Sequence, residues 1–210
     1  MCGRYSITKV VKKTKNIVQN NEGVEDLDNY NAYPTQKLPI VKKDADSLTL
    51  TNYHWGLVPK WSEKMTDFRP LNNARLETLM EKRTFSGLIK SQRCLVPADG
   101  YYEWRKNEEG KKFPYFLKRE HNETLFFAGL YQKNNNLEFS IITTEAQGEI
   151  SDIHHRMPVI LKEEEIKNYL YSKDPMTFLN SHQNPEIVFY EVGRDVNNPS
   201  NNHIGLLDPA

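Results

Sequence analysis

The chain has 210 residues, of which 38% are hydrophobic and 11% aromatic, and this ordinary composition excludes a disordered chain. Two cysteines are too few for a disulfide scaffold and fit a reducing compartment. There is no long apolar run and no signal-peptide pattern, so we expect a soluble, cytoplasmic protein that makes no contact with a membrane.

The formal net charge is zero, but the two halves of the chain differ. Residues 1–105 carry 17 basic and 12 acidic side chains, and residues 106–210 carry 11 and 16. Residues 1–21 hold Arg4 and four lysines without any acid. Such a basic face could attract phosphates, although a solvated helix face is the more common explanation of a charge cluster alone.

The first half of the chain is predicted to begin with an amphipathic helix over residues 8–20, because apolar side chains recur there at helical spacing. A turn or an extended segment is expected at 33–35, followed by strands at 38–41 and 48–55 around a polar turn. Residues 56–73 contain a glycine and two prolines and predict a long loop, and loops of that length are often functional.

The second half is predicted to be mostly short strands. Residues 77–83 and 86–90 are expected to be helical, and Asp99-Gly100 is a hairpin-like turn signal. The remaining expected elements are strands at 94–97, 101–105, 115–118, 125–131, 137–144, 157–161 and 187–192, and a helix at 163–171. Many short strands with few long helices indicate an α+β fold: an antiparallel, barrel-like β core with flanking short helices, in a single domain over 1–210.

Cys2 directly follows the initiator methionine, which is usually removed before so small a residue. Removal would give Cys2 a free α-amine with a reference pKa of about 7.7–8.0 beside a thiol with a reference pKa of about 8.5. Such a 1,2-aminothiol captures aldehydes: the amine forms an imine, and the sulfur closes on the same carbon to give a thiazolidine. A chance cysteine in a frayed terminus explains Cys2 alone equally well.

Common catalytic and cofactor motifs are missing from the sequence. There is no CxxC or HExxH pattern for a metal, no GxxxxGK[ST] or GxGxxG loop for a nucleotide, and no GxSxG elbow. We therefore expect no metal and no cofactor.

Five short strings in the chain are unusually specific when taken in order. They are MCGRY at 1–5, WGLVPKW at 55–61, NARLET at 73–78, PADGYYEW at 97–104 and DIHHRMP at 152–158. Together they resemble the SRAP family, named for SOS-response-associated peptidases, whose members process abasic sites in single-stranded DNA. The resemblance runs from Cys2 to about Val192, nearly the whole chain.

The resemblance implies that mature Cys2 crosslinks to the ring-opened sugar of an abasic site through a thiazolidine. On the matching strings, Asn73, Glu103 and His154 stand where the family has catalytic residues. His155 is adjacent but occupies the variable position of the His-x-Arg-x-Pro pattern.

The resemblance also implies a DNA-binding surface. Arg4 and Arg75 match DNA-contacting arginines, and Pro34 and Trp61 match positions that line the path of the strand. The chain departs from members with two adjacent tryptophans, because Ser62 takes the second place and the stretch from 61 to 73 is longer and more polar. Its neutral charge predicts weaker nonspecific DNA affinity than a basic member would show.

The candidate catalytic side chains suit this chemistry on their own. Glu103 lies between two aromatic residues, so partial burial would raise its pKa, and His154 is expected to titrate near neutrality. Asn73 could donate to the sugar or orient the amine. Without the resemblance, the commoner explanations are a strand-surface carboxylate, a hydrogen-bonding loop histidine and a turn residue.

The DNA-binding candidates also have ordinary alternatives. Arg4 and Arg75 offer bidentate phosphate contacts, but Arg75 could equally neighbour Glu77 at a helix start. Trp61, like the other tryptophans, is more often a core residue than a base platform. Cys94 lies in an apolar strand and is expected to be a buried small hydrophobe.

Three functions compete for this sequence. The first is a monomeric protein that binds single-stranded DNA containing abasic sites and has a crosslinking, lyase-type activity, with autopeptidase removal of Met1 as an addition. The second is an N-terminal-nucleophile amidase or glutaminase, in which Cys2 attacks an amide and its α-amine acts as the base. The third is a noncatalytic single-strand binder in which Cys2 has no role.

Overall fold

Strands dominate the computed structural model, which describes residues 2–62, 65–133 and 136–210. One antiparallel sheet has the order β14 (Val188–Glu191), β9 (Lys112–Lys118), β8 (Gly100–Lys106), β1 (Tyr5–Ile7) and β3 (Asn29–Ala32). The larger sheet has the order β12 (Arg156–Pro158), β11 (Leu137–Glu145), β10 (Leu125–Lys133), β7 (Arg93–Ala98), β4 (Lys37–Asp44), β5 (Ser47–Trp55) and β2 (Asn20–Asn21). Two further strands join it, β13 (Ile160–Leu161) on β10 and β6 (Asn73–Arg75) on β11.

The larger sheet closes on itself. Strand β5 pairs antiparallel with β4 and also pairs parallel with β11, where Trp55 lies beside Phe139. Strands β11, β10, β7, β4 and β5 therefore form a ring. This confirms the expected α+β fold with a barrel-like, largely antiparallel core.

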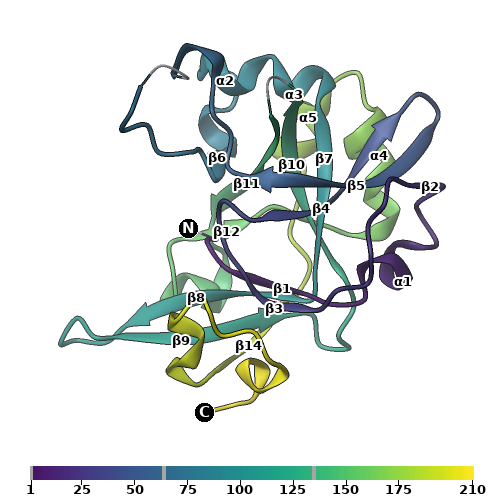
Figure 1. Cartoon of the computed structure of the whole chain (residues 1–210). Coiled ribbons are helices and arrows are strands. Elements are labelled where there is room, and N and C mark those ends of the chain that lie inside the picture. The colour runs from purple at the N-terminus through teal and green to yellow at the C-terminus, as the bar shows by residue number, and fades with distance from the viewer. Residues whose placement is uncertain (1, 63–64, 134–135) are drawn as a thin grey trace.

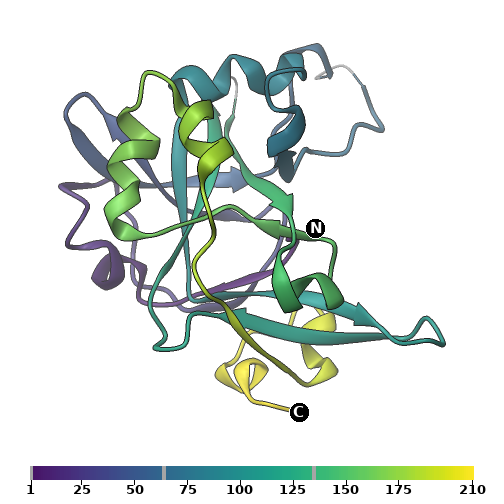
Figure 2. The ribbon, with the colours of Figure 1, turned by 180° about the vertical axis from the view of Figure 1, so that it is seen from behind.

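The helices are short and lie outside the ring. They are α1 (Val10–Thr14), α2 (Arg83–Ser86), α3 (Leu88–Ser91), α4 (Ile166–Tyr171) and α5 (Pro175–Ser181). Figures 1 and 2 show α2 to α5 gathered at one end of the molecule and the C-terminal segment packed below the smaller sheet at the other. No helix in the described part of the chain is long and apolar enough to span a membrane.

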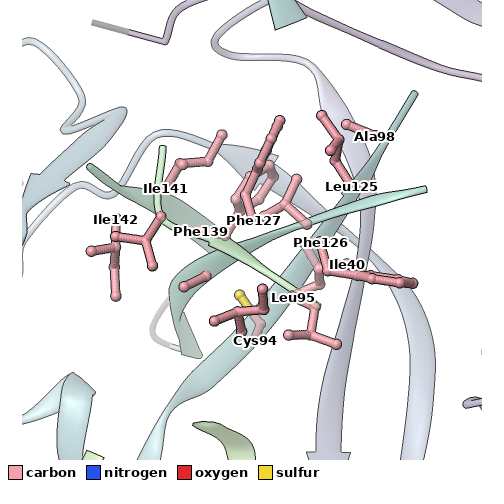
Figure 3. Close-up of a cluster of buried hydrophobic side chains, with 14 of the residues drawn as sticks. Ile40, Cys94, Leu95, Ala98, Leu125, Phe126, Phe127, Phe139, Ile141 and Ile142 are labelled. Carbon is pink, nitrogen blue, oxygen red and sulfur yellow. The ribbon is translucent and has the colours of Figure 1, made fainter. Parts of the chain in front are cut away.

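The core fills the ring. Figure 3 shows Ile40, Leu95 and Phe127 pointing into one cluster from β4, β7 and β10, three strands of the ring. Strand β7 is buried along its whole length, because the side chains of one face point into the ring and helices α3 and α4 pack against the strand from outside. Cys94 belongs to this cluster, so the prediction of a buried small hydrophobe is confirmed.

The predicted helix over 8–20 is wrong in extent, since α1 covers only Val10–Thr14. At the N-terminal end of the helix, the side-chain oxygens of Asp28 and Asp26 accept hydrogen bonds from the backbone amides of Lys9 and Val11. Beyond residue 18 the backbone pairs with β5 instead, because the amides of Gln19 and Glu22 donate to the carbonyls of Leu48 and Leu50. Pairing with a strand therefore outweighed the helical spacing of the apolar side chains.

The predicted hairpin turn at Asp99-Gly100 is also wrong. Strands β7 and β8 flank it, but they belong to different sheets, so the chain turns a corner there. The amide of Asp99 donates to the carbonyl of Ser6 on β1. Glycine is required at position 100 by close packing, because a Cβ atom would lie 2.4 Å from the Phe116 ring and 2.6 Å from the Leu117 carbonyl oxygen.

Other predicted segments hold with changed bounds. The strands at 38–41 and 48–55 are the longer hairpin β4–β5, and the turn at 33–35 is present. The predicted helices at 77–83 and 86–90 are present as the one-turn pieces η2 (Leu76–Thr78), α2 and α3, and the extended backbone at Lys82 separates η2 from α2. The strand at 157–161 is divided at Val159 into β12 and β13.

The loop over 56–73 is mostly irregular, with the 3-10 turn η1 (Lys60–Ser62); its residues 63 and 64 lie outside the described part. The helix at 163–171 is present as η4 (Glu163–Glu165) followed by α4. Helix α5, strands β1, β2, β3 and β6, and the 3-10 turns η3 (Gly148–Asp152), η5 (Arg194–Asn197) and η6 (Ile204–Leu207) were not predicted.

Candidate active site around Cys2

Cys2 lies three residues before β1 and has no solvent-exposed surface. Strand β6, which the ring strand β11 holds in parallel register, brings Asn73 beside it. The Nδ2 of Asn73 donates a hydrogen bond of 3.0 Å to the Cys2 carbonyl oxygen. The Oδ1 of Asn73 is buried and has no hydrogen-bond partner among the described residues, so this side chain has an acceptor left beside Cys2.

Glu103 and His154 form a pair at the same place. Glu103 is on β8 and only 3% exposed, so it is not a strand-surface carboxylate. His154 lies between η3 and β12, and its Nδ1 is 4.0 Å from the Oε1 of Glu103. The residues that the sequence separates by 51 positions therefore face each other in space.

Burial shifts the two pKa values in opposite directions. It raises the pKa of Glu103 to about 7, as the sequence predicted, and lowers the pKa of His154 to about 4. The expectation that His154 titrates near neutrality is therefore wrong. The Nδ1 of His154 lies 3.0 Å from the backbone nitrogen and 3.2 Å from the carbonyl oxygen of Arg156, so the backbone of Arg156 orients the imidazole ring.

The Cys2 thiol is protonated in this arrangement. Burial raises its pKa well above the ordinary value, and the nearby negative charge of Glu103 raises it further. A sulfur nucleophile at this position therefore needs a base to take its proton and a donor to stabilise the thiolate.

Arg4 is held in place by strand β3 and by the C-terminal part of the chain. Its Nη1 donates to the Oδ1 of Asn31 over 2.8 Å and to the carbonyl oxygen of Val196 over 2.9 Å. Its guanidinium lies 5.8 Å from the ring centroid of Tyr33, the residue before Pro34. Pro34 itself is half-buried in the turn between β3 and β4. Arg4 and Pro34 therefore belong to one surface region.

Arg75 and Trp61 are on the surface. Arg75 is exposed on β6, two residues beyond Asn73 and thus on the same face of that strand. Trp61 is 62% exposed in η1, where it packs edge to face against Phe68 at 5.4 Å. Ser62 is buried and donates to the Pro59 carbonyl oxygen over 2.8 Å, so it stabilises the turn and cannot act as a base platform.

One residue pair at the site was missed from the sequence. Arg156 is buried, and its Nη1 and Nη2 donate to the two carboxylate oxygens of Glu77 over 2.8 and 2.9 Å. Its Nη2 also donates to the Thr143 carbonyl oxygen over 2.6 Å. This bidentate pair joins the segment after Asn73 to the segment after His154. Both residues lie in the specific strings, which was the available signal.

Known proteins are similar to this chain in sequence and in fold. The family model of SRAP, "SOS response associated peptidase", matches residues 1–199. The chain is 34% identical to the abasic site processing protein YoqW of Bacillus subtilis over 99% of both proteins. It is 30% identical to the abasic site processing protein YedK of Escherichia coli over 89% of this chain and 86% of that protein.

A solved structure of a protein from Bacteroides thetaiotaomicron has a TM-score of 0.83 to this fold, at 26% identity and with 100% of both chains covered. Family model, relatives and structure agree over nearly the whole length of the chain. The chain therefore belongs to the SRAP family.

Proposed function

We propose that this protein processes abasic sites in single-stranded DNA by forming a thiazolidine between Cys2 and the opened sugar, once Met1 has been removed. The observation that carries the proposal is the surroundings of Cys2: its carbonyl oxygen accepts a hydrogen bond from Asn73, and the charge of Glu103, the partner of His154, acts on its thiol. The names of its relatives, abasic site processing proteins, give the substrate class.

The first step is imine formation. The α-amine of Cys2 adds to the sugar aldehyde, and the carbinol oxygen leaves as water after it gains a proton. Glu103 suits this exchange because a carboxyl with a pKa of about 7 is present in both protonation states at neutral pH. The unpartnered Oδ1 of Asn73 can accept a hydrogen bond from the amine and orient it.

The second step is ring closure. The sulfur adds to the imine carbon as a C–S bond forms, the C=N electron pair moves to nitrogen, and nitrogen takes a proton. The thiol proton passes to a base, for which the ionised form of Glu103 and the neutral imidazole of His154 are available. The steps consume one aldehyde and release one water, so no cofactor is required.

The strand would be held by its backbone. An abasic nucleotide has no base to read, so phosphate contacts and stacking must position it. Arg75 is exposed beside Asn73, and Arg4 uses only Nη1 in its bonds to Asn31 and Val196. The exposed ring of Trp61 can stack on a neighbouring base.

The test is adduct formation with a single-stranded oligonucleotide that bears one abasic site. Intact mass first establishes whether Met1 is absent from the purified protein. Wild-type protein should give a heat-stable adduct on a denaturing gel, and Cys2→Ala should give none. Cys94→Ala is the matched control, since Cys94 is the other buried free cysteine. A normal yield of heat-stable adduct from Cys2→Ala would overturn the aminothiol mechanism.

A further inference from the structure

A pocket lies beside Trp61, outside the site around Cys2. Its volume is about 470 Å³, within the usual range of ligand pockets. The residues that line it come from three separate segments: Pro59, Lys60, Trp61, Arg83, Thr84 and Gln132. Figures 1 and 2 show β6, the strand of Asn73 and Arg75, between the N-terminus and α2, which carries Arg83. The pocket and the Cys2 site therefore lie along the same side of the molecule.

Trp61 gives the pocket a fixed aromatic wall. The residue is 62% exposed, yet its ring packs edge to face against Phe68, with the ring centroids 5.4 Å apart. The turn that carries it is held by Ser62, whose amide and hydroxyl both donate to the Pro59 carbonyl oxygen over 2.8 Å. An exposed aromatic ring that is held in place in this way favours a flat ligand group that stacks on it.

The charged residues of the pocket are both basic. Lys60 and Arg83 are exposed, and no acidic side chain is among the lining residues. Because the whole chain has zero net charge, this local excess of positive charge is a feature of the pocket itself. It favours a ligand that carries phosphate groups next to its flat part, as a nucleotide does.

Gln132 adds a hydrogen-bond acceptor whose orientation is fixed. The residue is only 5% exposed, and its Nε2 donates to the Val58 carbonyl oxygen over 2.8 Å and to the Oε2 of Glu138 over 2.5 Å. The Val58 carbonyl can only accept, so the amide nitrogen must face it, and both amide hydrogens are used. The atom that Gln132 can still offer to a ligand is therefore Oε1, an acceptor.

We propose that this pocket is a base-selective subsite for one nucleotide of the bound single strand, with guanine preferred. The base stacks on Trp61, its O6 and N7 accept from Arg83, and its N1 hydrogen is donated to the Oε1 of Gln132. Lys60 contacts a neighbouring phosphate. Guanine fits because it presents two acceptors to a guanidinium and a donor on its other edge. The subsite rests on the proposed function for its single strand, but the base preference does not require the crosslink.

The test measures binding in the absence of crosslinking. The probes are oligothymidine strands in which a tetrahydrofuran residue, which has no aldehyde, replaces the abasic sugar. Each flanking position in turn carries guanine, adenine, cytosine, thymine or a second base-less residue, and fluorescence anisotropy gives the dissociation constant. At one position guanine should bind wild-type protein at least about fivefold more tightly than the other bases. The base-less residue should bind most weakly there.

Three variants assign the effect to the pocket. Arg83→Ala should remove the preference for guanine, and Trp61→Ala should remove most of the advantage of any base over the base-less residue. Lys82→Ala is the matched control, because Lys82 is exposed, precedes Arg83 and carries the same charge but does not line the pocket. It should keep the preference for guanine. All of these side chains are exposed, so the melting temperatures should stay at the wild-type value.

The role of Gln132 is tested through the ligand, because its amide also bonds Glu138 and Val58. Hypoxanthine keeps O6, N7 and the N1 hydrogen of guanine, whereas 1-methylhypoxanthine lacks the N1 hydrogen. Hypoxanthine should bind severalfold more tightly at the selective position. Equal binding of these two bases would overturn the role of Gln132. Equal affinity for the four bases at every position, preference for another base, a guanine preference that survives Arg83→Ala, or no binding of any probe would overturn the subsite.

Adduct formation with true abasic DNA separates this inference from the proposed function. If wild-type protein forms the heat-stable adduct but shows no base preference at any position, the inference fails and the proposed function stands. If the guanine preference is present and is lost in Arg83→Ala, while no adduct forms, the subsite stands and the proposed crosslinking fails.

Discussion

The environments of Glu103 and His154 raise the pKa of the carboxyl and lower the pKa of the imidazole, so the pair contains two distinct proton-handling groups. At neutral pH the imidazole is neutral and the carboxyl exchanges its proton, so Glu103 is the group that can serve as both acid and base. The sequence indicated the raised pKa of Glu103 through its aromatic neighbours. It could not indicate the lowered pKa of His154, because the burial responsible comes from segments distant in the chain.

The pKa of Glu103 makes a prediction about stability. Because burial raises it from 4.5 in the free residue to about 7, the folded protein holds this proton more tightly than the unfolded chain. Its contribution to stability is therefore complete below about pH 4 and is lost as the pH rises through about 7. Glu103→Gln should be more stable than wild type at about pH 8, by up to about 3 kcal/mol, and this advantage should vanish near pH 4.

Urea unfolding at both pH values measures this difference. The exposed carboxylate Glu81 supplies the control Glu81→Gln, which should show no such dependence. A stability difference between Glu103→Gln and wild type that is the same at both pH values would contradict the assignment.

At the scale of elements, the site is assembled from segments that no local pattern connects. The specific strings identified the segments around Asn73 and His154, but the Arg156–Glu77 bonds that join them span 79 positions. The same limit explains the hairpin predicted at Asp99-Gly100. Turn residues indicate that the chain changes direction. Whether the two flanking strands then pair as a hairpin or enter different sheets depends on the other strands that lie beside them.

Breaking this connection should affect both stability and chemistry. Glu77→Gln leaves the buried guanidinium of Arg156 without its carboxylate, so we expect a loss on the order of 1–3 kcal/mol in the free energy of unfolding. Adduct formation should also slow, because Asn73 and His154 lose their common support. Chemical denaturation and single-turnover kinetics measure the two effects, with Glu81→Gln as the control. Unchanged adduct kinetics in a destabilised Glu77→Gln protein would show that the pair only supports the fold.

At the scale of the whole molecule, the many short strands and few long helices expected from the sequence predicted the fold class. The closure of the ring was not predictable, since it depends on the parallel contact of β5 with β11 from far along the chain. The distribution of charge follows directly from the sequence: the neutral protein has a basic first half and an acidic second half. Nonspecific attraction to DNA should therefore be weak, and individual arginines should account for much of it.

A substitution of Arg75 tests the proposed DNA-binding surface. Arg75→Ala should weaken binding to single-stranded DNA and reduce the slope of log affinity against log salt by about 0.7, the value for one lost phosphate contact. Fluorescence anisotropy over a salt series gives the slope. Arg119→Ala is a suitable control, because Arg119 already pairs with Glu123. An unchanged slope in Arg75→Ala would mean that this side chain does not contact a phosphate.

The most direct test of the central claim is the chemical identity of the crosslinked residue. Protein and abasic single-stranded DNA are reacted, digested with protease and nuclease, and the N-terminal peptide is sequenced by tandem mass spectrometry. We predict that the sugar remnant lies on Cys2, that one water has been lost, and that neither a free thiol nor a free α-amine remains there. A sugar remnant on a lysine, or a modified Cys2 that keeps its free amine, would contradict the account.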